Sequence, residues 1–271
     1  MTLPRRRLRR RPRRFSPRPR AGTACVLVSG GLDSAVLLRD FSRRYRRVQP
    51  LYVRAGLRWE RAEIASLRAF LRALRSPRLL PLAFVHVPMS DLYAGHWSTT
   101  GRHTPGFHAG DESIYLPGRN LSLLSKAGTF CALRRIPVLG SGILNLNPFP
   151  DGTPGFFRAM QEALRRGLGT PIRILTPFRG LAKDDVIRRG RDLPLELTLS
   201  CANPRHGRHC GRCCKCAERV WAFGRAGVPD RTDYARGPGA AVPGSTGTSL
   251  RPAGWRDRTT RVAPKNATRA R

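Results

Sequence analysis

The sequence lacks a long apolar run. No stretch of its 271 residues approaches the roughly 20 consecutive apolar residues that a membrane-spanning helix requires. The Arg-rich first residues lack the apolar segment of a secretory signal peptide. We therefore expect a cytoplasmic protein that does not interact with membranes.

Acidic residues and lysine are also scarce. The chain has 17 acidic residues against 51 basic ones, only four of the basic residues are Lys, and the formal net charge is +34. Such a balance is typical of proteins that bind nucleic acid, but an Arg-biased codon usage explains the preference for Arg equally well. Residues 1–20 and 229–271 concentrate Arg among Pro, Gly and Thr, a composition that favours disorder. We expect one ordered domain over residues 21–228, with nucleic-acid binding through the basic ends as a less favoured alternative.

Cysteine is rare outside one short segment. Five of the seven cysteines fall within residues 201–216, whereas Cys25 and Cys131 lie singly in apolar runs. A disulfide framework spreads its cysteines along the chain, so this distribution favours a reducing compartment and a metal site. Cys25 and Cys131 are expected to be small core residues.

The clustered cysteines have the spacing of metal ligands. Eight, two and two residues separate the members of the set Cys201, Cys210, Cys213 and Cys216. Four thiolates at this spacing can close tetrahedrally around Zn²⁺ and leave no open position, which predicts a structural zinc site that fastens residues 200–226 to the fold. An iron–sulfur cluster is the competing occupant. Cys214 is expected to point away from the ion.

Between the two ends, apolar runs of strand length alternate with segments of helical periodicity. The strand patterns cover residues 24–28, 48–53, 79–87, 136–144 and 171–175, and the helical patterns cover residues 35–45, 59–74, 119–134, 156–168 and 183–191. This alternation predicts an α/β fold with a doubly wound, mainly parallel five-stranded sheet covered on both faces. A polar insertion at residues 90–113 is long enough to act as a lid.

The first strand pattern runs directly into Ser-Gly-Gly-Leu-Asp-Ser at residues 29–34. Two glycines between a buried strand and a helix build a loop whose backbone N–H groups point at an anion, so the motif predicts a phosphate cradle. Ser29 and Ser34 can add hydroxyl donors, and Asp33 can cap the helix or hold Mg²⁺. The spacing fits neither the Walker loop nor the dinucleotide fingerprint.

The order of the motifs resembles the 7-cyano-7-deazaguanine synthase family, which belongs to the N-type ATP pyrophosphatases with an SGGxDS pyrophosphate loop (PP-loop). The matching segments are residues 29–34, Leu-Pro-Gly-Arg-Asn at 116–120, Leu-Thr-Pro at 175–177, Leu-Ala-Lys-Asp-Asp-Val-Ile at 181–187, Ser200 with Cys201, and residues 210–216. The resemblance covers about residues 24–226. It implies an adenine nucleotide alpha hydrolase-like fold with a four-cysteine zinc knot.

The resemblance also implies an activity. That family converts 7-carboxy-7-deazaguanine, ammonia and ATP into 7-cyano-7-deazaguanine (preQ0), through an acyl-adenylate and an amide, on the way to queuosine-type nucleosides. It implies ATP, Mg²⁺ and Zn²⁺ as cofactors, and a homodimer is compatible with it.

Site residues follow from the same resemblance. It implies that Asp33 holds Mg²⁺, that Lys183 neutralises phosphate charge, and that Arg119 faces the adenylate or the base. The implied nucleotide-binding residues are Val28, Ser29, Gly30, Gly31, Leu32, Asp33, Ser34, Gly118 and Asn120. A helix cap and an ion pair at the sheet edge are the structural alternatives for Arg119 and Asn120. The structural alternative for Lys183 is a lysine on the surface of a helix.

The chain departs from the family pattern where the substrate is expected to bind. After the fourth strand the family carries a segment of the type Asp-Tyr-Ser-Gly-Tyr-Pro-Asp-Cys-Arg, of which Pro150 and Asp151 remain within residues 142–151. Phe149 can stack on a planar base or pack against the following helix. His103, His108 and Asp111 of the insertion can recognise a different acid or be solvated.

Two alternative functions follow. One is a paralogous ligase that adenylates another substrate and stops at an amide or a modified nucleoside. The other is a non-catalytic nucleotide- and RNA-binding zinc protein.

Overall fold

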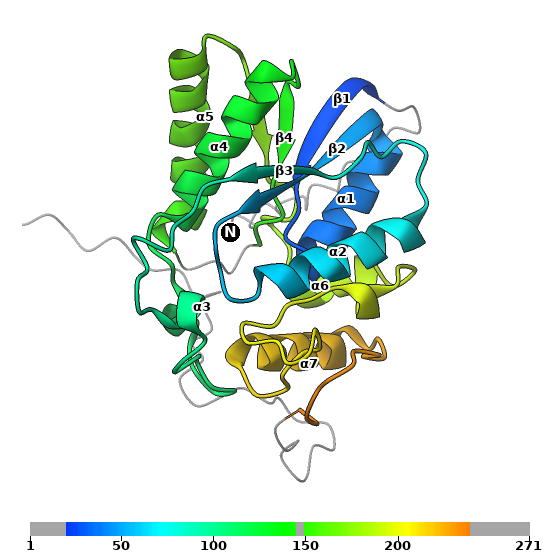
Figure 1. Cartoon of the computed structure of the whole chain (residues 1–271). Helices are drawn as coiled ribbons and strands as arrows, with labels where there is room; N and C mark the ends of the chain where they lie inside the picture. Colours follow the sequence, from blue (N-terminus) through cyan, green and yellow to red (C-terminus); the bar gives the residue numbers. More distant parts are fainter. Residues whose placement is uncertain (1–19, 145–148, 239–271) are drawn as a thin grey trace, which may run out of the picture.

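A five-stranded parallel sheet organises the protein. The computed structural model describes residues 20–144 and 149–238 (Figure 1). The strands are β1 (Arg20–Leu27), β2 (Tyr45–Arg54), β3 (Ala83–His86), β4 (Val138–Gly140) and β5 (Arg173–Leu175). All of them pair in parallel, in the order β3-β2-β1-β4-β5, which confirms the predicted fold class.

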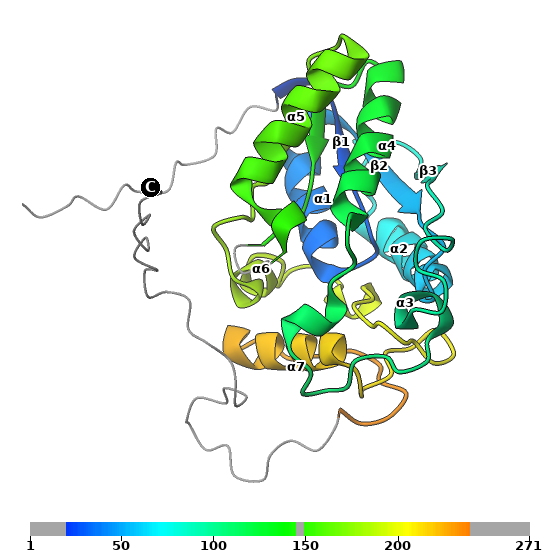
Figure 2. The same ribbon diagram turned by 90° about the vertical axis from the view of Figure 1, so that its left-hand side faces the viewer.

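Helices cover both faces of this sheet. The helices are α1 (Leu32–Arg44), α2 (Glu60–Leu74), α3 (Trp97–Thr100), α4 (Arg119–Leu133), α5 (Pro154–Leu168), α6 (Lys183–Arg189) and α7 (Cys214–Ala226). In two perpendicular views α4 and α5 lie on one face and α1, α2 and α6 on the other, while α7 lies beyond one end of the sheet (Figures 1 and 2). The chain leaves β1 in one direction through β2 and β3 and returns to place β4 on its other side. The junction of β1 and β4 is therefore the switch point at which ligands bind in such sheets.

The central strand supplies residues to two hydrophobic cores. Ala24 and Val26 pack in the core that α1, α2 and α6 close, and Cys25 packs in the core of α4 and α5. This alternation is the two-residue period of a strand buried on both faces. Cys25 and Cys131 are both completely buried, as expected for core residues.

The third and fourth strands are shorter than the sequence predicts. Residues 79–82 run beside β2, where Leu79 forms an isolated bridge with Val48, but the ladder of β3 begins only at Ala83. Proline explains both late starts, because Pro81 and Pro137 have no N–H to donate to a neighbouring strand.

The ordered part extends beyond the predicted boundary at residue 228. Residues 229–238 lie against the cysteine segment, where Tyr234 pairs with His209 and Ala235 N–H donates to the carbonyl oxygen of His209 at 2.7 Å. The prediction of disorder is therefore wrong for these ten residues. It missed them because the pairing is irregular and has no apolar period.

The rest of the two predicted tails, residues 1–19 and 239–271, lies outside the described residues, as does 145–148. Among the described helices, none has the length and apolar character needed to cross a bilayer.

Candidate active site and four-cysteine site

A cavity of about 200 Å³ lies at the carboxyl ends of β1 and β4. The loop after β1 contributes Val28 and Ser29 to its wall, the start of α1 contributes Asp33 and Ser34, and the loop after β4 contributes Ser141 and Gly142. Its remaining lining comes mainly from β2, α2 and α4, namely Leu27, Tyr52, Val53, Ala55, Leu57, Glu60, Glu63, Arg119, Asn120, Leu123, Leu124, Ile143 and Phe157. The cavity thus lies at the switch point of the sheet and brings the predicted loop together with Arg119 and Asn120.

Gly30 allows the loop after β1 to pass close to α2. Its φ is +76°, and a Cβ placed on it would lie 2.6 Å from the carbonyl oxygen of Glu63. Both observations require glycine. Gly31 is the residue that precedes α1, so the loop delivers its amides to the helix N-terminus, where an anion is favoured.

The hydroxyl groups of Ser29 and Ser34 form hydrogen bonds with backbone groups of the same loop. Ser34 Oγ donates to the carbonyl oxygen of Gly31 at 2.9 Å and accepts from the N–H of Ser29 at 3.2 Å. Ser29 Oγ accepts from the N–H of Gly31 at 3.3 Å. These bonds hold the loop in a closed turn. Leu32 is buried in the core beneath it and anchors the first turn of α1.

Asp33 and Lys183, two of the predicted catalytic residues, are in contact. Lys183 Nζ lies 3.1 Å from Asp33 Oδ2 and 2.9 Å from Glu218 Oε1. Burial by itself lowers the pKa of Lys183, but the two carboxylates outweigh it and raise that pKa above its ordinary value. Asp33 Oδ1 is buried and has no hydrogen-bond partner within the described chain. Glu218, which belongs to α7, is a member of this group that the sequence did not reveal.

The start of α4 presents Arg119 to the cavity. Gly118, with φ +74°, precedes the helix, and the Arg119 Nε is buried without a hydrogen-bond partner among the described residues. Asn120 has its donors occupied, since its N–H donates to Asp151 Oδ2 at 2.9 Å and its Nδ2 to the carbonyl oxygen of Asp151 at 3.0 Å. Arg119 is therefore available to an anion in the cavity, while the donors of Asn120 bind Asp151.

A buried acid on α2 lines the same cavity. Glu63 is 9% exposed, and its Oε2 accepts a hydrogen bond of 2.7 Å from the hydroxyl of Tyr52. The pKa of Glu63 is raised to about 7. Burial is the main cause and the charge of nearby Glu60 adds to it, while the Tyr52 hydrogen bond and the Arg119 charge partly offset the rise. Burial, followed by the charge of Glu63, raises the pKa of Tyr52 above its ordinary value.

Sequence reasoning did not identify Glu63 as a site residue. The available signal was its spacing of three residues from Glu60 at the start of a helix, which places both carboxylates on one helix face.

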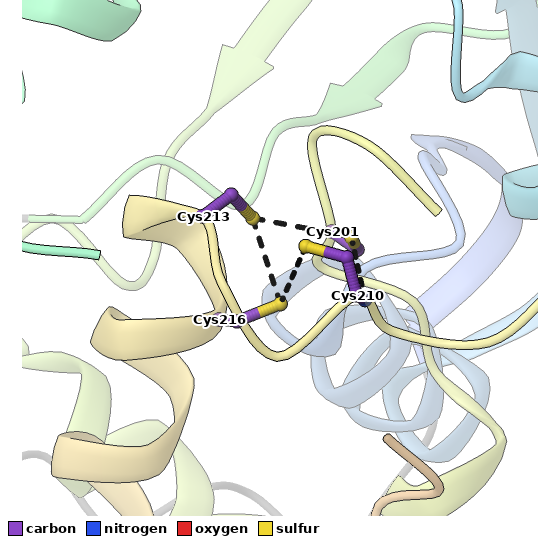
Figure 3. A group of neighbouring side chains, drawn as sticks. All are labelled: Cys201, Cys210, Cys213 and Cys216. Atoms are coloured by element: carbon purple, nitrogen blue, oxygen red, sulfur yellow. Dashed lines mark hydrogen bonds between the residues drawn. The ribbon is translucent and has the colours of Figure 1, made fainter. Parts of the chain in front are cut away.

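The four cysteine sulfurs converge on one point (Figure 3). They all lie within 4.8 Å of one another, with Sγ–Sγ distances of 3.9 Å for Cys201 and Cys213, 3.9 Å for Cys210 and Cys216, and 3.5 Å for Cys213 and Cys216. Four sulfurs about 2.3 Å from a single tetrahedral ion are about 3.8 Å apart. The donor set therefore fits one metal ion, whereas a four-iron cluster binds each cysteine on a separate iron and needs wider spacing.

Cys214 stands outside this group, as expected. It is buried, and burial raises the pKa of its thiol to about 12.

Arg219 ties the cysteine segment to its surroundings. Its side chain is 1% exposed and donates to the hydroxyls of Thr198 and Thr232 at 3.0 and 2.7 Å and to the carbonyl oxygen of Leu195 at 2.7 Å. One buried guanidinium thus joins α7 to the segment before it and to the segment after it.

The insertion at residues 90–113 packs on the cysteine segment. Gly106 pairs with Cys213, and Phe107 makes an edge contact with Trp221 of α7 at 5.5 Å between ring centroids. His108 lies beside the same two rings, and His103 is exposed. Because none of the three aromatic contacts reaches the cavity, the insertion braces α7 rather than presenting His108 to a substrate.

Phe149 does not stand free as a stacking platform for a base. Its ring stacks on Tyr115 with 4.8 Å between centroids.

Comparisons with known proteins show the family of the chain. Residues 23–227 match the family model described as queuosine biosynthesis protein QueC. The 7-cyano-7-deazaguanine synthase of Methanosphaerula palustris is 32% identical over 78% of this chain and 98% of its own length, and that of Anaeromyxobacter dehalogenans is 33% identical over 80% and 97%. A 4-thiouridine synthetase solved with RNA and bound ATP aligns with 74% of this chain and 50% of its own at 15% identity and a TM-score of 0.44. The chain belongs to the QueC family of queuosine biosynthesis proteins.

Proposed function

We propose that this chain is a 7-cyano-7-deazaguanine synthase, a ligase that uses ATP to convert 7-carboxy-7-deazaguanine and ammonia into the nitrile preQ0. The observation that carries the proposal is the joint placement of the PP-loop, with Asp33, and of Arg119 around one cavity in a chain of the QueC family. We place the reaction in the cytoplasm, where ATP is available and thiols stay reduced.

Activation of a carboxylate explains the arrangement of charges. A carboxylate is a poor electrophile, so its oxygen attacks the α-phosphorus of ATP and pyrophosphate leaves. The N–H groups of Leu32, Asp33 and Ser34 in the first turn of α1 stabilise the charge that develops on pyrophosphate. The buried Nε of Arg119 binds the carboxylate or the α-phosphate.

Lys183 acts on Asp33 and not directly on phosphate. Its ammonium group already contacts the carboxylates of Asp33 and Glu218, and Lys215 also pairs with Glu218, so the positive charge of Lys183 is already balanced. Lys183 therefore orients Asp33, and we assign it a positioning role.

The orphaned Asp33 Oδ1 fits a ligand of Mg²⁺, which prefers carboxylate oxygens. The ion would supply positive charge to the pyrophosphate. Zn²⁺ fits the four thiols and would supply structural stability only, because all four positions are taken.

The test is to incubate the protein with ATP, Mg²⁺, ammonium and 7-carboxy-7-deazaguanine. We expect AMP and pyrophosphate to form only when the deazapurine acid is present, and mass spectrometry to detect the nitrile. Accumulation of an amide without nitrile would favour the paralogous ligase, and the absence of acid-dependent pyrophosphate would refute the proposal. Asp33→Asn serves as the inactive control.

A further inference from the structure

Glu63 is a buried carboxyl group beside the loop that holds phosphate. Its backbone carbonyl approaches Gly30 so closely that only glycine fits there, and its side chain lines the cavity together with Ser29, Asp33 and Arg119. The Tyr52 hydroxyl fixes one carboxyl oxygen at 2.7 Å. Glu63 is thus held in place in the wall of the cavity that contains the phosphate loop and Arg119.

The other two acids of the cavity are engaged elsewhere. Asp33 pairs with Lys183 at 3.1 Å through Oδ2, and we have assigned its unpartnered Oδ1 to Mg²⁺. Glu60 accepts from the N–H groups of Ala55 and Gly56 at 2.9 and 3.0 Å and from Arg54 Nε at 2.7 Å. Among the residues that the structure describes, Tyr52 is the one hydrogen-bond partner of the Glu63 side chain, so this carboxylate retains capacity to accept a proton.

We propose that Glu63 is the general base for the attack of ammonia on the acyl-adenylate, a role that rests on the proposed function. The nitrogen lone pair forms a bond to the acyl carbon, and the carbonyl π electrons move to oxygen. The Glu63 carboxylate takes one proton from the cationic nitrogen. The carbonyl then re-forms, the bond from carbon to the AMP oxygen breaks with its electron pair on AMP, and Glu63 returns its proton to water. One ammonia and one adenylate give one amide and one AMP.

The surroundings of Glu63 suit this task. Burial raises its pKa to about 7, and a general base is most effective when its pKa lies near the working pH. The charged and titratable groups that face it are Tyr52 on β2, Glu60 on α2 and Arg119 on α4. Arg119 and the Tyr52 hydroxyl keep a useful fraction of Glu63 ionised, because both favour the carboxylate.

Separation of adenylation from amide formation tests the proposal. In Glu63→Gln we expect acid-dependent exchange between ATP and labelled pyrophosphate to stay near the wild-type rate, while amide formation falls about 10²-fold or more. Hydroxylamine, whose attacking nitrogen loses its proton more readily to water, should restore acyl transfer by at least about tenfold relative to ammonia. Glu63→Asp, which keeps a carboxylate, should lie between Gln and wild type.

Glu162→Gln is the matched control, since Glu162 is on the outer surface of α5, where it pairs with Arg165 and Arg166. It should behave as wild type in both assays. Thermal unfolding of Glu63→Gln should show no loss of stability near neutral pH, because the neutral amide replaces a costly buried charge.

The outcomes are distinguishable. Parallel loss of exchange and amide formation in folded Glu63→Gln, or wild-type amide formation in that variant, overturns the role of Glu63 alone. Absence of exchange in the wild-type chain overturns the proposed function, and the role of Glu63 with it.

Discussion

The backbone N–H of Leu199 donates a hydrogen bond of 2.8 Å to the carbonyl oxygen of Gly30. Leu199 is buried two residues before Cys201, and Gly30 is the first glycine of the PP-loop. A second connection runs from Glu218 of α7 through Lys183 to Asp33. The four-cysteine site and the nucleotide loop are therefore joined by both backbone and side chains, and loss of one should disturb the other.

Removal of the metal is the first test of this coupling. We expect a strong chelator, or Cys213→Ser, to lower the unfolding midpoint by about 5 °C or more, about 2 kcal/mol for a chain of this size. The reason is that, without a metal ion to hold the four thiols together, residues 201–216 lose the bonds that stabilise their fold. ATP affinity should fall in the same samples, measured by calorimetry.

Cys214→Ser is the control for that experiment, because Cys214 is equally buried yet outside the metal group. It should retain one equivalent of metal by elemental analysis. We expect zinc, and a stoichiometric iron content would contradict the assignment.

Asp33→Ala should abolish turnover and preserve the fold. We expect acid-dependent pyrophosphate release to fall at least about 10²-fold, because the orphaned Oδ1 is lost from the cavity. Lys183 keeps Glu218 as a partner, so the unfolding midpoint should change little. Glu162→Ala, a surface change on α5, should retain activity. A large drop in the midpoint of Asp33→Ala would instead make Asp33 a structural residue.

The strand and helix periods of the sequence predicted the sheet well, because burial on both faces leaves long apolar runs such as that of β1. The cysteine set was equally visible, since its ligands lie close together in the chain. Glu63 and Glu218 were not, because each meets its partners only after distant elements pack: Glu63 meets Tyr52 across α2 and β2, and Glu218 meets Lys183 across α7 and α6. The spacing of Glu60 and Glu63 places both carboxylates on one helix face, but it does not separate a solvated face from a site.

The same reason explains the missed boundary at residue 228. Residues 229–238 are held by single hydrogen bonds to Arg219 and His209, which leave no periodic pattern.

The boundary can be tested directly. A chain ending at residue 228 should be about 2 kcal/mol less stable than one ending at residue 238, because the buried Arg219 loses Thr232 and Asp230 as partners. Denaturant unfolding of the two chains measures the difference, and equal midpoints would show that these contacts contribute nothing.

The pH dependence of amide formation provides the last prediction. Because a general base must be ionised, the rate should rise with pH through a midpoint of about 7, the raised pKa of Glu63. Tyr52→Phe removes a hydrogen bond that lowers this pKa, so the midpoint should shift to higher pH. The rates are measured at saturating ATP and at a constant concentration of unprotonated ammonia, so that titration of the nucleophile does not contribute. The free energy of unfolding should fall as the pH rises from about 4.5 to about 7. The reason is that the pKa of Glu63 in the folded state lies above the ordinary value of 4.5, so ionisation of Glu63 opposes folding over this window. A midpoint that stays fixed or moves down in Tyr52→Phe would show that another group titrates.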